Sequence, residues 1–211
     1  MSRTLTAADR SALIRLAVTL PVGSDERRAI LAGLSRAPRT ATEINIPGKH
    51  ILENAQVSGR AQVFGQAKVS GDSKVWGNAR VFGKASIEDT AEVFDNAKVY
   101  GNESWVRGEA KVYGNAELFD GTVSNEAEVF GNAQLFSAQV FDYAMVFGNA
   151  QVSNSTVAGN AKVFGDAKIS GRAAVYEDAR IGGTAVILGG KWDGSEGEIL
   201  SGTWRAPGVP A

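Results

Sequence analysis

The chain offers few side chains that could carry out catalysis. It contains one histidine, His50, and no cysteine. The lack of cysteine excludes disulfides, thiolate metal sites and cysteine nucleophiles. Histidine is the commonest general base near neutral pH, but His50 lies just before the regular part of the sequence, not within it. We therefore expect His50 to be an ordinary surface or end residue.

A series of polar residues recurs at nearly constant spacing along the chain. Its members are Asn78, Asn96, Asn115, Asn132, Asn149 and Asp166. Oxygen-bearing side chains such as these can bind Ca²⁺. Most of them are neutral amides, however, and the nonapeptide pattern of calcium-binding β-helices is absent. We interpret the series as a ladder of turn-forming residues, named here the asparagine ladder, and predict no metal site.

The spacing of these residues comes from a six-residue repeat between Ile51 and Ile187. Blocks such as VWGNAR (75–80) and VFGDAK (163–168) open with an aliphatic residue and place a small residue, usually Ala, four positions later. The aliphatic residue suits a buried strand position. The Gly and Asn or Asp between them tolerate the positive φ of a tight corner. A short fixed period of this kind is the signature of a β-helix.

This pattern resembles the hexapeptide-repeat, left-handed parallel β-helix superfamily. The resemblance covers about two-thirds of the chain and lies in the aliphatic residue at position one and Ala, Ser or Thr at position five. It implies a triangular prism with three hexapeptides per coil and a left-handed path, although most parallel crossovers are right-handed. We predict an all-β solenoid, a left-handed parallel β-helix of about eight coils, over residues 41–190.

Departures from the six-residue period keep step with a three-sided coil. Three spacings contain five residues: Leu118–Val123, Leu135–Val140 and Val152–Val157. They recur at 17-residue intervals, and the single seven-residue spacing, Val99–Val106, falls one coil earlier on the same side. Random drift would not keep this phase. We therefore predict that the irregular blocks stack on one side of the prism.

Once the three sides are in register, two of them carry large outward rings. The first ring ladder consists of Trp76, Phe94, Tyr113, Phe130, Phe147 and Phe164. The second ring ladder consists of Phe64, Phe82, Tyr100, Phe119 and Phe136. Coils about 4.8 Å apart allow successive rings to pack together. So much apolar surface is more than monomers usually expose, and the superfamily that the repeat resembles commonly forms threefold trimers. We predict a homotrimer with both ladders at its interfaces.

The ends of the chain follow different patterns. Residues 1–40 predict a helical hairpin, broken by Pro21, Val22 and Gly23, with apolar stripes in both halves. Open β-helix ends carry unpaired strand edges, so the hairpin is expected to be a cap or, alternatively, a docking segment for another protein. Residues 191–211 predict a C-terminal cap with a loose tail, in which Trp192 and Trp204 seal the far end.

Composition limits the classes of partner. The net charge of −1 and the pI near 5.9 lack the basic surplus of nucleic-acid-binding proteins. No apolar run approaches the roughly 18 residues of a membrane span. The polar N-terminus does not resemble a signal peptide, so a cytoplasmic or virion-associated location is expected.

These patterns favour a non-enzymatic role. We predict a rigid trimeric rod that acts as a spacer, decoration or adaptor in a larger assembly such as a phage particle, without a cofactor, and that contacts another protein through its hairpin or one end. The resemblance also implies an alternative, a hexapeptide-repeat acyltransferase with an acyl-CoA donor and His50 as its base. The repeats contain no histidine and no long loop, which favours the first interpretation. A second alternative is glycan binding along solvent-exposed ring ladders.

Overall fold

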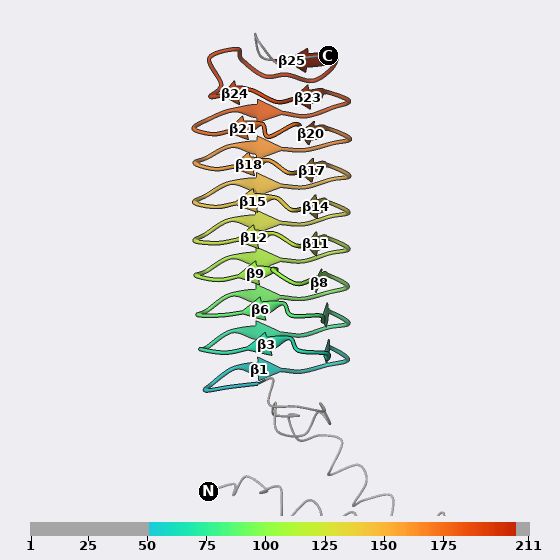
Figure 1. Cartoon of the computed structure of the whole chain (residues 1–211), viewed down its shortest axis with the longest axis vertical. Helices are drawn as coiled ribbons and strands as arrows, with labels where there is room; N and C mark the ends of the chain where they lie inside the picture. Colours follow the sequence, from blue (N-terminus) through green and yellow to red (C-terminus); the bar gives the residue numbers. More distant parts are fainter. Residues whose placement is uncertain (1–50, 206–211) are drawn as a thin grey trace, which may run out of the picture. The chain divides into compact units, whose positions relative to one another are not determined.

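The chain winds into an all-β parallel solenoid (Figure 1). The computed structural model describes residues 51–205, which make about nine turns. The solenoid predicted from the repeat is therefore confirmed. The helical hairpin predicted for residues 1–40, and His50, lie outside the described residues.

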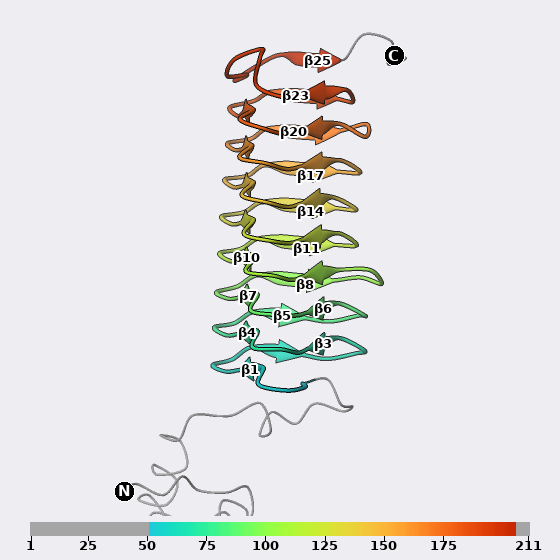
Figure 2. The same ribbon diagram turned by 90° about the vertical axis from the view of Figure 1, so that its left-hand side faces the viewer.

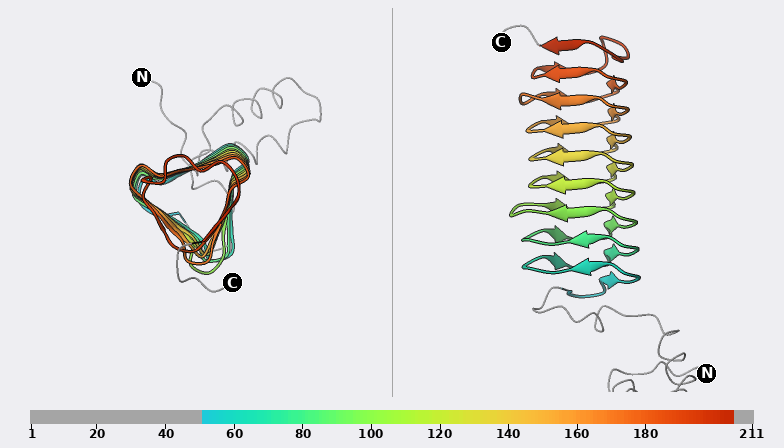
Figure 3. Two further views of the ribbon diagram at one scale, coloured as in Figure 1. Left: turned by 90° about the horizontal axis from the view of Figure 1, so that it is seen from above. Right: turned by 90° about the vertical axis from the view of Figure 1, so that its right-hand side faces the viewer.

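Each turn contributes one short strand to each of three parallel sheets, which form the sides of a three-sided coil seen end-on in Figure 3. Sheet 1 contains β1 (Gln56–Val57), β4 (Lys74–Val75), β7 (Glu92–Val93), β10 (Lys111–Val112), β13 (Glu128–Val129), β16 (Met145–Val146), β19 (Lys162–Val163) and β22 (Arg180–Ile181). Sheet 2 contains β2 (Gln62–Val63), β5 (Arg80–Val81), β8 (Lys98–Tyr100), β11 (Glu117–Phe119), β14 (Gln134–Phe136), β17 (Gln151–Ser153), β20 (Lys168–Ser170), β23 (Val186–Leu188) and β25 (Thr203–Arg205). Sheet 3 contains β3 (Lys68–Val69), β6 (Ser86–Ile87), β9 (Trp105–Val106), β12 (Thr122–Val123), β15 (Gln139–Val140), β18 (Thr156–Val157), β21 (Ala174–Val175) and β24 (Lys191–Trp192).

The core is a narrow column of aliphatic and small side chains. The first residue of each block, such as Val129 or Leu135, is fully buried, and so is the alanine four positions later, such as Ala133. A few serines replace these alanines, and their hydroxyls are satisfied inside the chain. The Oγ of Ser73, for example, donates to the carbonyl oxygen of Ser70 at 2.7 Å. Within residues 51–205 every buried side-chain nitrogen and oxygen has a hydrogen-bond partner, as buried polar groups require.

The corners depend on one backbone conformation that recurs in nearly every block. The residue two positions after the buried aliphatic has a positive φ, for example 74° at Gly148 and 61° at Asn125. Glycine takes this position most often because a Cβ is strained there. At Gly148 an added Cβ would also lie only 2.9 Å from the backbone nitrogen of Gly165 in the next turn.

Between Ile51 and Ile187, all irregular blocks fall at the corner between sheets 2 and 3, named here the short-turn corner. In sheet 2, Leu118 pairs with Leu135 and Leu135 with Val152, each 17 residues later, whereas Val63 pairs with Val81, 18 residues later. Figure 2 shows the turns after β11, β14 and β17 ending short of the turns after β8 and β20. The prediction that these blocks stack on one side of the prism is confirmed.

The solenoid continues beyond the last hexapeptide, which is why it has about nine turns rather than the eight predicted. Strand β24 extends sheet 3, and β25 extends sheet 2 by pairing Trp204 with Ile187. Larger residues take the inward positions here, since Trp192 is buried and Ile199 bridges to Ile181. The rings of Trp192 and Trp204 meet edge to face, with centroids 6.1 Å apart.

The corner conformation leads to a first prediction. We expect Gly148→Ala to lower the free energy of unfolding by about 1–2 kcal/mol, the cost of a left-handed backbone for a residue with a Cβ. Glu177→Gly, at the same block position with φ 55°, is the matched control. It should leave the stability unchanged or raise it. Denaturant unfolding followed by circular dichroism measures both, and equal stability of Gly148→Ala and the parent chain would contradict this account of the corner.

Candidate functional site

The first ring ladder is a continuous stack on the outside of sheet 1. Its ring centroids lie 4.4 to 5.5 Å apart, and the interplanar angles do not exceed 13°. Each inner ring is covered on both faces by its neighbours in the turns above and below, so the rings are half-buried. The ring edges are what the stack presents to solvent.

A cation closes the end of the first ring ladder that lies nearer the C-terminus, named here its upper end. The guanidinium of Arg180 lies 5.5 Å from the centroid of the Phe164 ring and pairs with the carboxylate of Glu198 at 2.8 Å. Gly182 takes the next ladder position, where an added Cβ would collide with the Phe164 ring at 2.3 Å. A cation over a ring face is a favourable contact. The Arg180 guanidinium and Gly182, which has no side chain, together end the stack at Phe164.

The second ring ladder is regular only in its lower half. Phe64, Phe82 and Tyr100 stack at 5.0 and 4.8 Å with nearly parallel planes. The planes of Phe119 and Phe136 are tilted by 55°, with centroids 6.3 Å apart. Phe136 is the last ring of this ladder and is 39% exposed. Ser153 pairs with it in the next turn, so no ring of this ladder covers its upper side.

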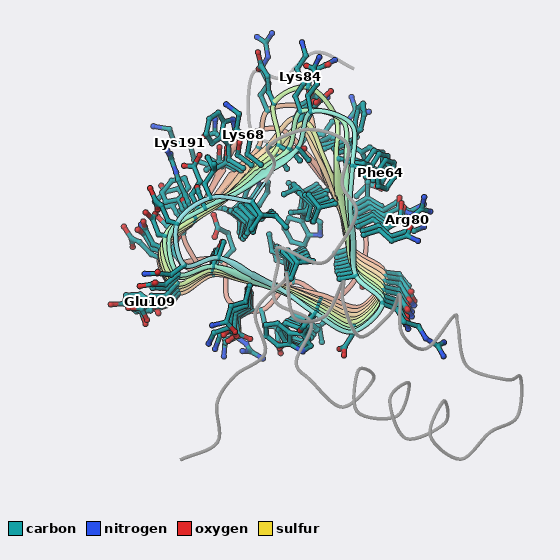
Figure 4. The ribbon with its side chains drawn as sticks, turned by 90° about the horizontal axis from the view of Figure 1, so that it is seen from below. Phe64, Lys68, Arg80, Lys84, Glu109 and Lys191 are labelled. Atoms are coloured by element: carbon teal, nitrogen blue, oxygen red, sulfur yellow. The ribbon has the colours of Figure 1, made fainter. Side chains whose placement is uncertain are left out.

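The two ladders lie at different corners. The first ring ladder directly precedes the corner between sheets 1 and 2, which carries Asn78 and its counterparts and is named here the asparagine corner. The second ring ladder lies at the far end of sheet 2. Figure 4 shows Phe64 between Arg80 and Lys84 on the outside of that sheet, with Lys84 at the short-turn corner. The ladders occupy adjacent sheets, as predicted, but they do not adjoin each other.

The asparagine ladder forms a continuous chain of hydrogen bonds along its corner. Each amide Nδ2 donates to the Oδ1 of the residue one turn later, at 2.8 to 3.0 Å, from Asn78 to Asp166. Five bonds thus join six consecutive turns. The side chains are exposed, so their contribution is to register and stiffness more than to burial.

Carboxylates at the corners make contacts that the sequence analysis does not identify. At four corners an acidic residue replaces the glycine, and its carboxylate accepts a hydrogen bond from the backbone N–H of the glycine one turn later: Glu53, Asp89, Asp95 and Asp142. Asp89 accepts from Gly108 at 2.9 Å, and Asp95 accepts from Gly114 at 3.2 Å. These four residues share a sequence signal, an acidic residue at the third position of a block followed one turn later by glycine at that position.

Charged residues on sheet 1 pair with one another along the rod axis. Lys74 lies 3.3 Å from Glu92, and Lys111 lies 4.0 Å from Glu128. The hydroxyl of Tyr113 donates to Glu128 at 2.9 Å. Burial, followed by the hydrogen bond to this carboxylate, raises the pKa of Tyr113 to about 12.

Two shallow depressions lie at the corners of the rod. One, of about 520 Å³, lies between sheets 3 and 1 and is lined by charged residues that include Asp72, Lys74, Glu92 and Glu109. The other, of about 350 Å³, lies at the short-turn corner and is lined mainly by neutral polar residues. Within residues 51–205 no group of three or more His, Cys, Asp or Glu side chains could hold a metal ion. No helix in this part of the chain is long and apolar enough to cross a membrane.

Comparison with known proteins adds no relative. No family model matches the chain, and neither the curated proteins nor the solved structures contain a match. The fold is compatible with a β-helix superfamily, and functional inference depends on the surface of the rod itself.

The asparagine ladder leads to a second prediction. Asn115→Ala removes two ladder hydrogen bonds, and we expect it to lower the free energy of unfolding by about 1 kcal/mol, since exposed bonds contribute at the low end of their usual range. Asn160 donates a single side-chain bond, to Asp178 at 3.1 Å at another corner. Asn160→Ala should therefore cost about half as much. If both substitutions lowered the stability equally in thermal unfolding, a place in the asparagine ladder would contribute no more than a single corner hydrogen bond.

The environment of Tyr113 leads to a third prediction. Its pKa is raised from 10.0 to about 12 in the folded chain, so the folded state holds the phenolic proton more tightly than the unfolded state does. This contribution to stability is complete below pH 10 and is lost as the pH rises through about 12. Tyr113→Phe should reduce the loss of stability across this window. An ultraviolet titration in which Tyr113 ionises near pH 10 would contradict the assignment.

Proposed function

We propose that this protein is a non-enzymatic, rigid β-helical rod that assembles into a homotrimer and acts as a spacer, decoration or adaptor in a larger structure. The observation that carries the proposal is the pairing of an unbroken six-ring stack with a five-bond amide ladder beside one corner. Both features run parallel to the rod axis over six turns, and neither resembles a substrate cleft.

Stiffness is the property that these features supply. Each turn is bonded to the next by backbone hydrogen bonds on all three sides, such as Phe130 N–H to the Val146 carbonyl oxygen at 3.0 Å. The ladders add a second set of contacts with the same period. A stack of about nine turns at about 4.8 Å spacing extends roughly 40 Å along its axis, a suitable length for a spacer.

The proposed trimer places the asparagine corner at a threefold axis. When three such rods meet corner to corner, the facing sheets of neighbouring rods diverge away from the axis. Side chains close to the shared corner then touch, and those at the far end of a sheet do not. The first ring ladder lies close to this corner and would be covered. The second ring ladder lies at the far end of sheet 2 and would stay accessible. The proposed interface therefore includes the first ring ladder and not the second.

The opposing surface suits ring edges. In this arrangement the first ring ladder faces the outward residues of sheet 2 that follow the asparagine corner in the neighbouring copy, such as Lys98, Glu117 and Gln134. Ring edges carry partial positive charge and favour carboxylate and amide oxygens, and the lysine stem adds apolar contact. Each half-buried ring that becomes covered contributes part of the roughly 1.5–3 kcal/mol of full burial.

We also propose that the coil is left-handed, in keeping with the superfamily that the repeat resembles. Support comes from its three sides, its six-residue blocks and the positive φ at its corners. Glycan binding along the first ring ladder is not favoured, because stacked rings cover each other's faces and a sugar ring packs on an open face. The acyltransferase alternative depends on His50 and stays a prediction, as does a phage setting.

The trimer gives the fourth prediction. Sedimentation equilibrium at micromolar concentration should return three times the mass of one chain. The double substitution Phe130→Gln and Phe147→Gln should shift the protein to monomer, because it removes apolar ring edges next to the axis. A wild-type chain that sediments as a monomer would overturn the proposal.

The matched control is Phe141→Gln. Phe141 occupies the same block position on sheet 3, away from the asparagine corner, and is likewise half-buried. This variant should keep the trimer mass. Circular dichroism melting of all three proteins separates a loss of assembly from a loss of folding, since the stacked rings also stabilise the single chain. A monomeric Phe141→Gln variant that remains folded would place the interface elsewhere.

A further inference from the structure

The recess at the short-turn corner exists because the chain is shorter there. It has a volume of about 350 Å³ and spans the turns that follow β14, β17 and β20. The first two of these turns belong to five-residue blocks, and their corner residues are Ser137 and Asn154. The third is a full six-residue block whose corner carries Arg172, which forms the upper side of the recess. The missing residues thus produce a depression at one height on the rod.

The lining offers unpaired hydrogen-bonding groups. Ser155 is buried and already bonded, since its hydroxyl donates to the Ser153 carbonyl oxygen at 2.8 Å and accepts from the Ala173 N–H at 3.1 Å. The side chains of Gln139, Asn154, Thr156 and Arg172 make no hydrogen bond or ion pair with any residue in the described range 51–205. Together they present amide, hydroxyl and guanidinium groups within one concave surface.

An exposed aromatic ring, that of Phe136, directly precedes the recess in the chain. Phe136 directly precedes Ser137, and its carbonyl oxygen accepts from the Asn154 N–H at 2.9 Å. It is 39% exposed and ends the second ring ladder, with Ser153 and then Ser170 at the equivalent positions of the next two turns. This ring therefore has a free side, unlike the inner rings of the first ring ladder.

We propose that this recess is a binding site for a neutral oligosaccharide. A sugar ring has an apolar C–H face that suits the negative face of an aromatic ring and hydroxyls that both donate to and accept from amides, hydroxyls and guanidinium groups. Arg172 is the one charged residue in the lining. The other depression is lined by several charged residues, among them the ion pair of Lys74 and Glu92, and by no aromatic ring, so it does not share these properties.

The site belongs to a single chain and is independent of the proposed trimer. It lies at the corner away from the asparagine corner, so it would stay open in that assembly and would exist equally in a monomer. A protein that is monomeric and still binds sugar would therefore contradict the proposed trimer but not the proposed sugar site.

The test, our fifth prediction, is saturation-transfer NMR on the full-length protein with neutral hexasaccharides of glucose, mannose, galactose and N-acetylglucosamine. We expect at least one of them to receive saturation from the protein. Phe136→Ala and Asn154→Gly should each reduce the transfer at least fivefold. Glycine suits position 154 because the φ there is 45°, so the second variant removes the amide without straining the corner.

Two further variants make the test specific to the recess. Insertion of a glycine after Ser153 restores a six-residue block with the usual Gly-Asn corner, and the lengthened turn should abolish binding while the chain stays folded. Asn125→Gly, at a positive-φ position of a different corner, should bind like the wild type. The proposal is overturned if no neutral hexasaccharide receives saturation, if transfer survives the insertion, or if only a sulfated hexasaccharide is bound.

Discussion

The structure depends on one constraint, the in-register stacking of each turn on the one before at the spacing of β-strands. Because parallel pairing repeats every 17 to 19 residues, as for Val112 with Val129 and with Val93, each side chain has its counterpart directly above and below. Identical residues must then tolerate each other at about 4.8 Å. Flat rings and amides do so, whereas the column of Lys74, Glu92, Lys111 and Glu128 alternates opposite charges.

Much of this arrangement could be predicted from the sequence because the period is short and its irregularities are in phase. The buried positions, the three sides and the side that carries the five-residue blocks all follow from spacing. The ring positions also follow from it, since Phe130 and Phe147 occupy the same place in successive turns. A periodic sequence fixes which residues form a column without any knowledge of distant contacts.

Other features depend on geometry that spacing does not contain. The tilt between Phe119 and Phe136, and with it the open side of Phe136, depends on how rings adjust where a column ends. The recess arises where two shortened corners lie next to the full-length corner of Arg172, and its depth does not follow from residue spacing. The ninth turn could not be predicted because the buried Trp192 and Ile199, and Trp204 in register with Ile187, lack the hexapeptide pattern around them. In each case local side-chain shape replaces the regular period.

The asparagine ladder has a direction, and this determines where it can end. An asparagine amide both donates and accepts, so it passes the chain of hydrogen bonds on to the next turn, whereas an ionised aspartate only accepts. The ladder ends at Asp166, and the two shorter runs at another corner, from Asn125 to Asp142 and from Asn160 to Asp178, end in the same way. An aspartate therefore ends each chain of hydrogen bonds. Asparagine and aspartate have nearly the same shape, so the choice between them sets how many turns each chain of hydrogen bonds spans.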